Sequence, residues 1–189
     1  MPIKYLIIGI SVVWFLSEIF LGLIKHSRQQ SADNLDKSSF RFLWIVIVIS
    51  VTIGVFIGLG KTGRVVEFGP WLSICGISFI IAGLVIRWIA ILTLKKYFTV
   101  DVAVQRDHRL LTSGIYKHIR HPSYSGSLLS FIGLGLSFSN WLTLVVVAVP
   151  VFIAFYYRIR VEEKVMASVF KTEYAGYRSR TKKLIPFII

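Results

Sequence analysis

Five apolar stretches alternate with segments rich in charged and polar residues. They cover residues 3–24, 42–59, 71–94, 124–138 and 141–157. Each of the first three is long enough to cross a hydrocarbon core of about 30 Å, because an α-helix rises about 1.5 Å per residue. The pattern predicts an all-α, multi-pass membrane protein with five transmembrane helices, in which residues 1–189 form a single domain.

The last two stretches are short and are joined by only two polar residues, Ser139 and Asn140. Such a connection predicts a tight C-terminal helical hairpin. Pro122 suits the first turn of the hairpin's opening helix, because a proline there removes no intrahelical hydrogen bond. The hairpin returns the chain to the face from which it entered, so residues flanking it on both sides should lie close together.

The chain carries a formal net charge of +13, although only 16% of its residues are charged. Four, six and eight of the 22 lysines and arginines lie in the segments 25–41, 95–120 and 158–183, beside the apolar stretches. Because cytoplasmic loops of membrane proteins are enriched in such residues, we expect an external N-terminus, five crossings and a cytoplasmic C-terminus. The charge pattern indicates contact with a lipid bilayer rather than with nucleic acid.

Two charged residues interrupt the apolar stretches at similar depth. Glu18 precedes the end of its stretch by six residues and Arg87 by seven. A charge inside the membrane is costly unless it is paired or hydrated. Either the two side chains form an ion pair, or each extends separately to the interface.

Polar residues that could do chemistry concentrate on the cytoplasmic side, in residues 107–124 and 156–163. Arg158 and Glu162 are four residues apart and share one helix face, which fits either a binding site or an exposed salt bridge. Glu163 points elsewhere, toward Arg160. The earlier segment, with its tyrosines beside a helix start, suits either an adenosine-like ligand with a charged tail or an interfacial aromatic belt. We expect no metal site.

The motifs in these segments are Arg120-His121-Pro122-x-Tyr124-x-Gly126, preceded by His108-x-Leu110-Leu111-Thr112-x-Gly114-x-Tyr116, and Arg158-x-x-x-Glu162-Glu163 after the hairpin. Across residues 70 to 189 the chain resembles the isoprenylcysteine carboxyl methyltransferase family of integral membrane enzymes. It departs from the family at Lys171 and Thr172, where the family often has Gly and an acidic residue.

The resemblance implies S-adenosyl-L-methionine as methyl donor and cofactor, bound in a pocket at the cytoplasmic face within a catalytic region of about residues 95–189. The acceptor would be lipophilic, most simply the carboxylate of a prenylated cysteine or a similar prenyl thiol acid. Arg158 would bind the acceptor through a partly exposed contact, and Arg158 and Glu162 would be catalytic. The implied cofactor-binding residues are His108, Arg109, Leu110, Leu111, Tyr116, His121, Pro122, Ser123, Tyr124 and Glu162.

Other functions remain open from the sequence. A phospholipid or amine N-methyltransferase would need a base such as Glu163 or a histidine, and a sterol-type reductase would bind a nicotinamide cofactor. A small membrane scaffold or transporter subunit would bind neither cofactor. We expect a prokaryotic inner membrane, or the endoplasmic reticulum in a eukaryote, with the active site facing the cytoplasm.

Overall fold

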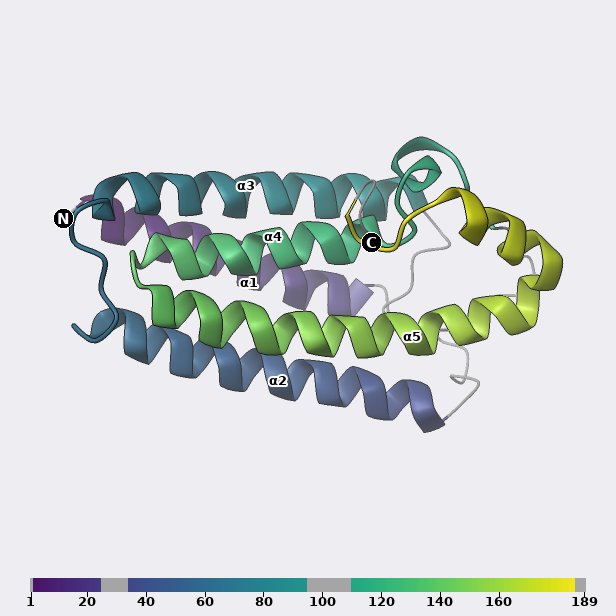
Figure 1. The fold of residues 1–189 in the computed structure, drawn as a ribbon, viewed down its shortest axis with the longest axis horizontal. Helices are drawn as coiled ribbons and strands as arrows, with labels where there is room; N and C mark the ends of the chain where they lie inside the picture. The colour runs from purple at the N-terminus through teal and green to yellow at the C-terminus, as the bar shows by residue number, and fades with distance from the viewer. Residues whose placement is uncertain (1, 25–33, 95–109, 186–189) are drawn as a thin grey trace.

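The computed structural model describes residues 2–24, 34–94 and 110–185, which form an all-α bundle (Figure 1). α4 lies beside α3, and α5 lies between α4 and α2, while α1 packs mainly against α3. The elements in chain order are α1 (Pro2–Ile24), α2 (Asn34–Leu59), α3 (Gly69–Leu94), the short 3-10 helix η2 (Gly114–Lys117), α4 (Pro122–Ser137) and α5 (Trp141–Arg180).

Within the described residues, three helical segments are long and apolar enough to cross a membrane: 38–59 in α2, the whole of α3, and α5. α4 has 16 residues, and α1 contributes only the shorter apolar segment Gly9–Glu18. Large apolar side chains such as Phe56, Val85 and Ile153 are exposed on the outer faces of these helices. Lipid covers such faces in membrane proteins. The multi-pass membrane fold is therefore confirmed, whereas five crossings remain a prediction.

The predicted hairpin is present as α4 and α5. Pro122 occupies the first turn of α4, and Ser139 adopts a positive φ of 49° between the helices. Asn140 caps α5, because its side-chain oxygen accepts from the backbone N–H groups of Leu142 and Thr143 at 3.0 and 3.2 Å. This is the usual role of Asn at a helix start.

α5 continues far beyond the predicted end of its apolar stretch at residue 157. Its 40 residues reach Arg180, and the residues before a kink at Lys171 already span about 45 Å, which exceeds the thickness of a hydrocarbon core. Residues 158–170 contain neither Gly nor Pro, so nothing in the sequence stops the helix where its apolar character ends. The distal part of α5, residues 158–180, extends past the other helices and then turns back toward the start of α4 (Figure 1).

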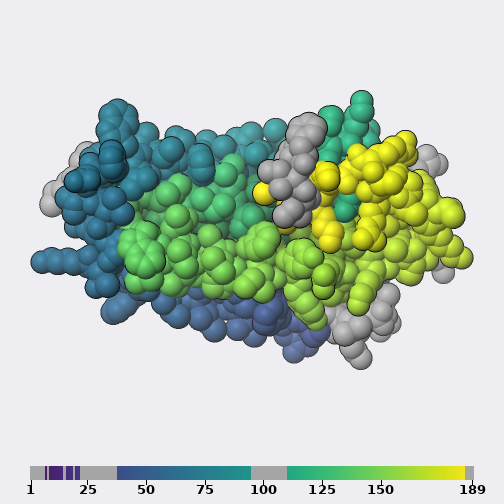
Figure 2. Space-filling model, in the orientation of Figure 1, coloured from purple at the N-terminus to yellow at the C-terminus, as the bar shows by residue number. Residues whose placement is uncertain are grey.

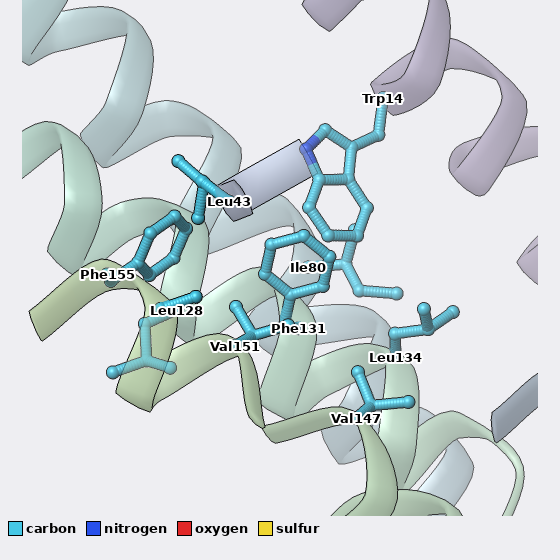
Figure 3. Close-up of a cluster of buried hydrophobic side chains, with 10 residues drawn as sticks. Trp14, Leu43, Ile80, Leu128, Phe131, Leu134, Val147, Val151 and Phe155 are labelled. Carbon is cyan, nitrogen blue, oxygen red and sulfur yellow. The ribbon is translucent and has the colours of Figure 1, made fainter. Parts of the chain in front are cut away.

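The core draws side chains from all five α-helices (Figure 3). Trp14 of α1 packs on Phe131 of α4 with a ring-centroid distance of 4.7 Å. On its other side Phe131 contacts Phe155 of α5, with ring centroids 6.1 Å apart. These aromatic contacts hold α4 at the centre of the bundle, so the start of α4 has a defined position relative to α5.

Four glycines allow α3 and α4 to approach closely. Gly76 lies opposite Gly133, and Gly83 lies opposite Gly126. A Cβ atom added at Gly126 would lie 2.5 Å from the carbonyl oxygen of Gly83. Because that neighbour is backbone, it cannot rotate away, and the two helices would have to separate.

Gly126→Ala is therefore expected to destabilise the protein by about 2 kcal/mol, the usual cost of overpacking, and to lower its Tm by about 5 °C. The measurement is thermal unfolding of the detergent-purified protein. Gly176→Ala is the matched control, because a Cβ there meets nothing within 4 Å. Equal Tm values for the two variants would contradict the close approach of α3 and α4.

Candidate active site

The intramembrane charges are paired, which confirms the first of the two alternatives. The Arg87 guanidinium on α3 forms an ion pair with Glu18 on α1. Its Nη1 also donates to the hydroxyls of Ser123 at 3.0 Å and Ser127 at 2.8 Å, both on α4. The pair thus ties three helices together and fixes the first turns of α4.

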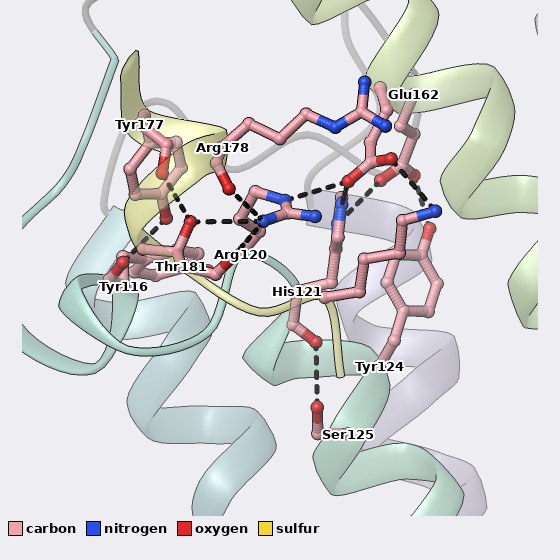
Figure 4. A network of polar contacts seen from close by, with 11 residues as sticks. Tyr116, Arg120, His121, Tyr124, Ser125, Glu162, Tyr177, Arg178 and Thr181 are labelled. Atoms are coloured by element: carbon pink, nitrogen blue, oxygen red, sulfur yellow. Dashed lines mark hydrogen bonds and ion pairs between the residues drawn. The ribbon is translucent and has the colours of Figure 1, made fainter. Parts of the chain in front are cut away.

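Residues on either side of the hairpin converge at one end of the bundle, as the hairpin predicts (Figure 4). The Tyr124 hydroxyl donates to Glu162 Oε1, and His121 Nδ1 lies 3.6 Å from Glu162 Oε2. Arg158 Nε donates to Glu162 Oε1 at 3.2 Å. One carboxylate of α5 therefore gathers a guanidinium, an imidazole and a phenol, and its side chain remains 20% exposed.

Glu163 does not point toward Arg160, contrary to the expectation from spacing. Its carboxylate is buried and lies within ion-pair distance of Arg120 at 2.9 Å, Lys183 at 3.2 Å and His121 at 3.5 Å. Arg160 instead donates to the hydroxyl of Tyr156 at 3.2 Å. Glu163 and Arg160 do not meet because they lie on different faces of α5: Glu163 faces α4, whereas Arg160 faces outward.

The electrostatics of Glu163 favour its ionised form. Burial by itself raises the pKa of this carboxyl, but hydrogen bonds and charge from His121 and Arg120 outweigh it and hold the pKa at about 2, below the ordinary value of 4.5. His121 thus lies between two carboxylates, Glu162 and Glu163, and is fixed by both.

The chain after α5 returns to the start of α4. We call residues 181–185 the C-terminal strap. The backbone N–H groups of Arg120 and His121 donate to the carbonyls of Lys182 and Lys183 at 2.8 and 3.0 Å. The Ser125 hydroxyl donates to the carbonyl of Leu184. In Figure 2 the yellow C-terminal residues lie on the surface at this end of the molecule.

Arg120 joins the strap to α5. Its Nη1 donates to the carbonyls of Arg178 and Thr181, and its Nε donates to Glu163. The hydroxyl of Tyr177 donates to the carbonyl of Tyr116 at 2.7 Å, which fixes η2 against the same segment. The strap therefore forms a structural part of the site.

A kink at Lys171 turns the end of α5 back toward α4. This residue has φ 41° and ψ −113°, a conformation that glycine adopts readily and residues with a Cβ adopt at a cost. The position is one of the two at which the chain departs from the family pattern. The kink brings Tyr177 and Thr181 to Arg120.

Lys171→Gly is expected to stabilise the protein by about 1 kcal/mol by removing this backbone strain, which raises the Tm by about 3 °C. Lys164→Gly is the matched control in the regular part of the same helix, where glycine costs up to about 1 kcal/mol. Thermal unfolding of both variants in detergent checks the opposite signs. A loss of stability in Lys171→Gly would contradict the strain.

Arg158 is more enclosed than expected. Only 1% of the residue is exposed, whereas the sequence suggested a partly exposed side chain. The burial comes from α2, where Ser39 accepts a hydrogen bond from Arg158 Nη1 at 2.6 Å and the Phe40 ring centroid lies 5.7 Å from the guanidinium carbon.

The other expected cofactor residues that the structure describes lie at the start of α4, in η2 and just before η2. Pro122 is buried at the start of α4, Ser123 accepts from Arg87, and the hydroxyl of Tyr116 donates to the carbonyl of Ala90 on α3 at 3.3 Å. Leu110 and Leu111 are partly buried at the start of the third described range. His108 and Arg109 lie outside the described residues.

Sequence reasoning missed several members of the site. Arg120 stands directly before His121 in the motif, so its position was a usable signal. Lys183 and Thr181 belong to a basic tail in which no spacing marks one residue rather than another as a member of the site. Ser39 offered no signal, because it lies 119 residues before its partner Arg158.

The chain is similar to known methyltransferases. The model of the isoprenylcysteine carboxyl methyltransferase (ICMT) family matches residues 76–168. Protein-S-isoprenylcysteine O-methyltransferase B of Arabidopsis thaliana is 35% identical over 120 residues, which are 62% of this chain and 61% of the relative. The Saccharomyces cerevisiae protein-S-isoprenylcysteine O-methyltransferase is 36% identical over 118 residues, 61% of this chain and 49% of the relative. The chain thus spans about half to three fifths of the length of these relatives.

A solved structure extends the likeness to the fold. The eukaryotic intramembrane Ras methyltransferase ICMT has a TM-score of 0.63 and 31% sequence identity, over 77% of this chain and 52% of that chain. The matched region of the family model contains both α4 and the part of α5 that carries Arg158, Glu162 and Glu163. By sequence and by fold, the chain is similar to the isoprenylcysteine carboxyl methyltransferase family.

Proposed function

We propose that this chain transfers the methyl group of S-adenosyl-L-methionine to the carboxylate of an S-prenylcysteine or a similar prenyl thiol acid. The single observation that carries the proposal is the convergence of Arg158 and Glu162 of α5 with His121 and Tyr124 of α4. That arrangement offers a cation for an anionic acceptor beside a carboxylate and a ring nitrogen for a polar donor. Catalytic roles for Arg158 and Glu162 follow from it.

The residues present fit the proposed methyl donor. His121 Nε2 is buried, and within the described part of the chain its contact with Glu163 Oε1 is a long one of 3.5 Å, so this nitrogen can also bind a polar group of the donor. Glu162 is partly exposed and can accept from an ammonium or a ribose hydroxyl. We assign donor binding to His121 and Glu162, with Tyr116, Pro122, Ser123 and Tyr124 as the adjoining wall. Leu110, Leu111, His108 and Arg109 would extend that wall.

The donor, when bound, supplies a methyl carbon that its sulfonium makes electrophilic. A carboxylate acceptor is ionised at neutral pH, so the chain needs no general base and contributes mainly by alignment, which can supply several kcal/mol. Arg158 orients the acceptor oxygen. Because Arg158 is also paired with Glu162, its positive charge only partly neutralises the acceptor carboxylate, which stays nucleophilic. Burial of Arg158 keeps water from the acceptor side.

The proposed topology places this site at the inner membrane boundary. Five crossings with an external N-terminus would put both the start of α4 and the distal part of α5 on the cytoplasmic side, where the lysines and arginines gather. The polar donor would arrive from the cytoplasm, and the prenyl tail of the acceptor would enter sideways from the lipid. A prokaryotic inner membrane is the proposed location.

The test is methyl transfer by the purified protein with labelled S-adenosyl-L-methionine. The acceptors are an S-prenylcysteine, its preformed methyl ester and phosphatidylethanolamine. We expect label only in the free acid, because the ester has no carboxylate to attack. Label in phosphatidylethanolamine alone would favour an amine N-methyltransferase, and failure to bind the donor at millimolar concentration would favour a scaffold.

Donor binding is tested separately by titration of His121→Ala. We expect donor affinity to fall about tenfold, the usual effect of removing one hydrogen bond to a charged group. His118→Ala is the control, because His118 is exposed three residues earlier. Unchanged affinity in His121→Ala would remove this residue from the donor pocket.

A further inference from the structure

One guanidinium on α3 reaches the donor wall that the proposed function places at the start of α4. The Nη1 of Arg87 donates to the Ser123 hydroxyl at 3.0 Å and to the Ser127 hydroxyl at 2.8 Å. Ser127 in turn donates to the backbone carbonyl of Ser123 at 3.1 Å. These contacts hold both the side chain and the backbone of Ser123.

Glu18 holds the same guanidinium from a third helix. It forms an ion pair with Arg87 Nη2 from α1, so the two terminal nitrogens of the guanidinium contact different helices. A planar guanidinium with partners on both terminal nitrogens cannot rotate without breaking one of these contacts. Both side chains are mostly enclosed, with 15% and 16% exposed. Glu18 lies outside residues 76–168, which the family model matches.

The backbone of α3 lies close to α4 at this point. A Cβ atom added at Gly126 would lie 2.7 Å from the backbone nitrogen of Arg87. About one turn further along α3, the carbonyl of Ala90 accepts from the hydroxyl of Tyr116 at 3.3 Å. The same stretch of α3 therefore contacts two residues assigned to the donor wall, Ser123 and Tyr116.

The Ser123 hydroxyl has its proton still to donate. Its oxygen accepts from Arg87, and within the described residues its O–H donates to no partner. A hydroxyl can accept and donate at the same time. A hydrogen bond received from a cation polarises the O–H and makes it a stronger donor. Such a group suits an anionic partner, and S-adenosyl-L-methionine carries a carboxylate.

We propose that Arg87 is a positioning residue for the methyl donor, which orients the Ser123 hydroxyl so that this group donates to the carboxylate of S-adenosyl-L-methionine. Glu18 holds Arg87 in that orientation from α1. The proposal rests on the proposed function, since it takes Ser123 as part of the donor wall. Arg87 itself touches neither substrate in this scheme.

The test is titration of the purified protein in detergent with S-adenosyl-L-methionine alone, without an acceptor. Arg87→Lys keeps the charge opposite Glu18 but lacks the fork that contacts two helices at once. We expect the Kd of the donor to rise about fivefold, as for the loss of one hydrogen bond. The acceptor KM should stay within about twofold of wild type, because Arg158, which binds the acceptor under the proposed function, lies on α5.

Ser130→Ala is the matched control for contact between α3 and α4. Ser130 is buried on α4 about two turns beyond Ser123, and its hydroxyl donates to the Ile80 carbonyl of α3 at 3.2 Å. Its substitution removes a polar contact between the same two helices, away from the donor wall, so the Kd of the donor should stay within about twofold of wild type.

A double-mutant cycle separates the proposed role from a general disturbance of packing. In a Ser123→Ala background, Arg87→Lys should cause no further loss of donor affinity, because the hydroxyl through which Arg87 acts is already absent. Glu18→Gln/Arg87→Gln is the second variant, because it removes both charges together and leaves no unpaired charge in the membrane. It should weaken donor binding as much as Arg87→Lys does, even if Arg87→Lys folds poorly.

Three results would overturn the proposal. Unchanged donor affinity in Arg87→Lys and in Glu18→Gln/Arg87→Gln removes the role of Arg87 and leaves the proposed function intact. A further loss when Arg87→Lys is added to Ser123→Ala shows that Arg87 does not act through the Ser123 hydroxyl. A wild-type protein that does not bind the donor at millimolar concentration removes both the proposal and the proposed function.

Discussion

Arg158→Ala is expected to lower methyl transfer to an S-prenylcysteine by about 10²–10³-fold, the range typical of removing one preorganised donor from an active site. The side chain is buried, with Nε on Glu162 and Nη1 on Ser39. Under the proposed function, its removal would leave the acceptor carboxylate without its cation. The measurement is the initial rate of label transfer from S-adenosyl-L-methionine in membranes.

Arg160→Ala is the control for this experiment, because Arg160 is exposed on the same helix and contacts Tyr156 rather than the site. Its rate should stay within about twofold of wild type. Arg158→Lys separates charge from geometry, since it keeps the positive charge but loses the planar fork, and we expect it to be impaired nearly as much as Arg158→Ala. Near-normal turnover in Arg158→Ala would remove its assigned role.

Arg120→Ala is expected to destabilise the protein by about 3 kcal/mol, because breaking a buried ion pair leaves its partner charge poorly compensated. The guanidinium contacts the Glu163 carboxylate and the carbonyls of Arg178 and Thr181. Its loss therefore detaches the C-terminal strap as well. A fall in Tm of about 10 °C follows, measured by thermal unfolding in detergent at neutral pH.

Arg178→Ala is the matched control for this loss of stability. The Arg178 side chain is exposed, and only its backbone carbonyl, which alanine retains, contacts Arg120. We expect a change within about 0.5 kcal/mol, as for most surface substitutions. Equal Tm values for Arg120→Ala and Arg178→Ala would show that the buried pair contributes nothing.

The pH dependence of the Arg120→Ala effect has a defined sign. Glu163 has a folded-state pKa of about 2, below its ordinary 4.5, so its ionised form adds stability above pH 4.5 and this contribution disappears as pH falls through 2. Arg120 is one cause of that low pKa. The difference in Tm between wild type and Arg120→Ala should therefore be largest above pH 4.5 and shrink toward pH 2. A constant difference would contradict the coupling.

The parts of the site that could be predicted from the sequence are those formed by residues close together along the chain. The motif around His121 and the four-residue spacing of Arg158 and Glu162 place these residues at the two ends of a hairpin, and two polar residues between apolar stretches require the hairpin. The equal depth of Glu18 and Arg87 indicated an ion pair as one of two alternatives, because an unpaired charge in lipid is costly, and the structure decided between them. In each case a residue is placed by its separation in sequence from the end of one helix or from one short turn. That separation, multiplied by the rise per residue of a helix, gives its position.

The site was not predictable where a partner comes from far along the chain. Glu162 and Glu163 are adjacent, and successive residues point about 100° apart on a helix, so only the packing angle of α5 on α4 decides which one meets Arg120. The kink at Lys171 had no local signal either, because a lysine with positive φ persists only when surrounding contacts hold it.

The sequence by itself determined the helical class, the order of the apolar helices and the hairpin, because backbone groups in lipid must bond within their own helix and so apolar length specifies a crossing segment. Tertiary structure alone decided how far α5 extends before turning back, that the strap closes on Arg120, and that Ser39 buries Arg158. Those features depend on side-chain contacts between segments up to 119 residues apart, and no periodicity in the chain encodes such contacts.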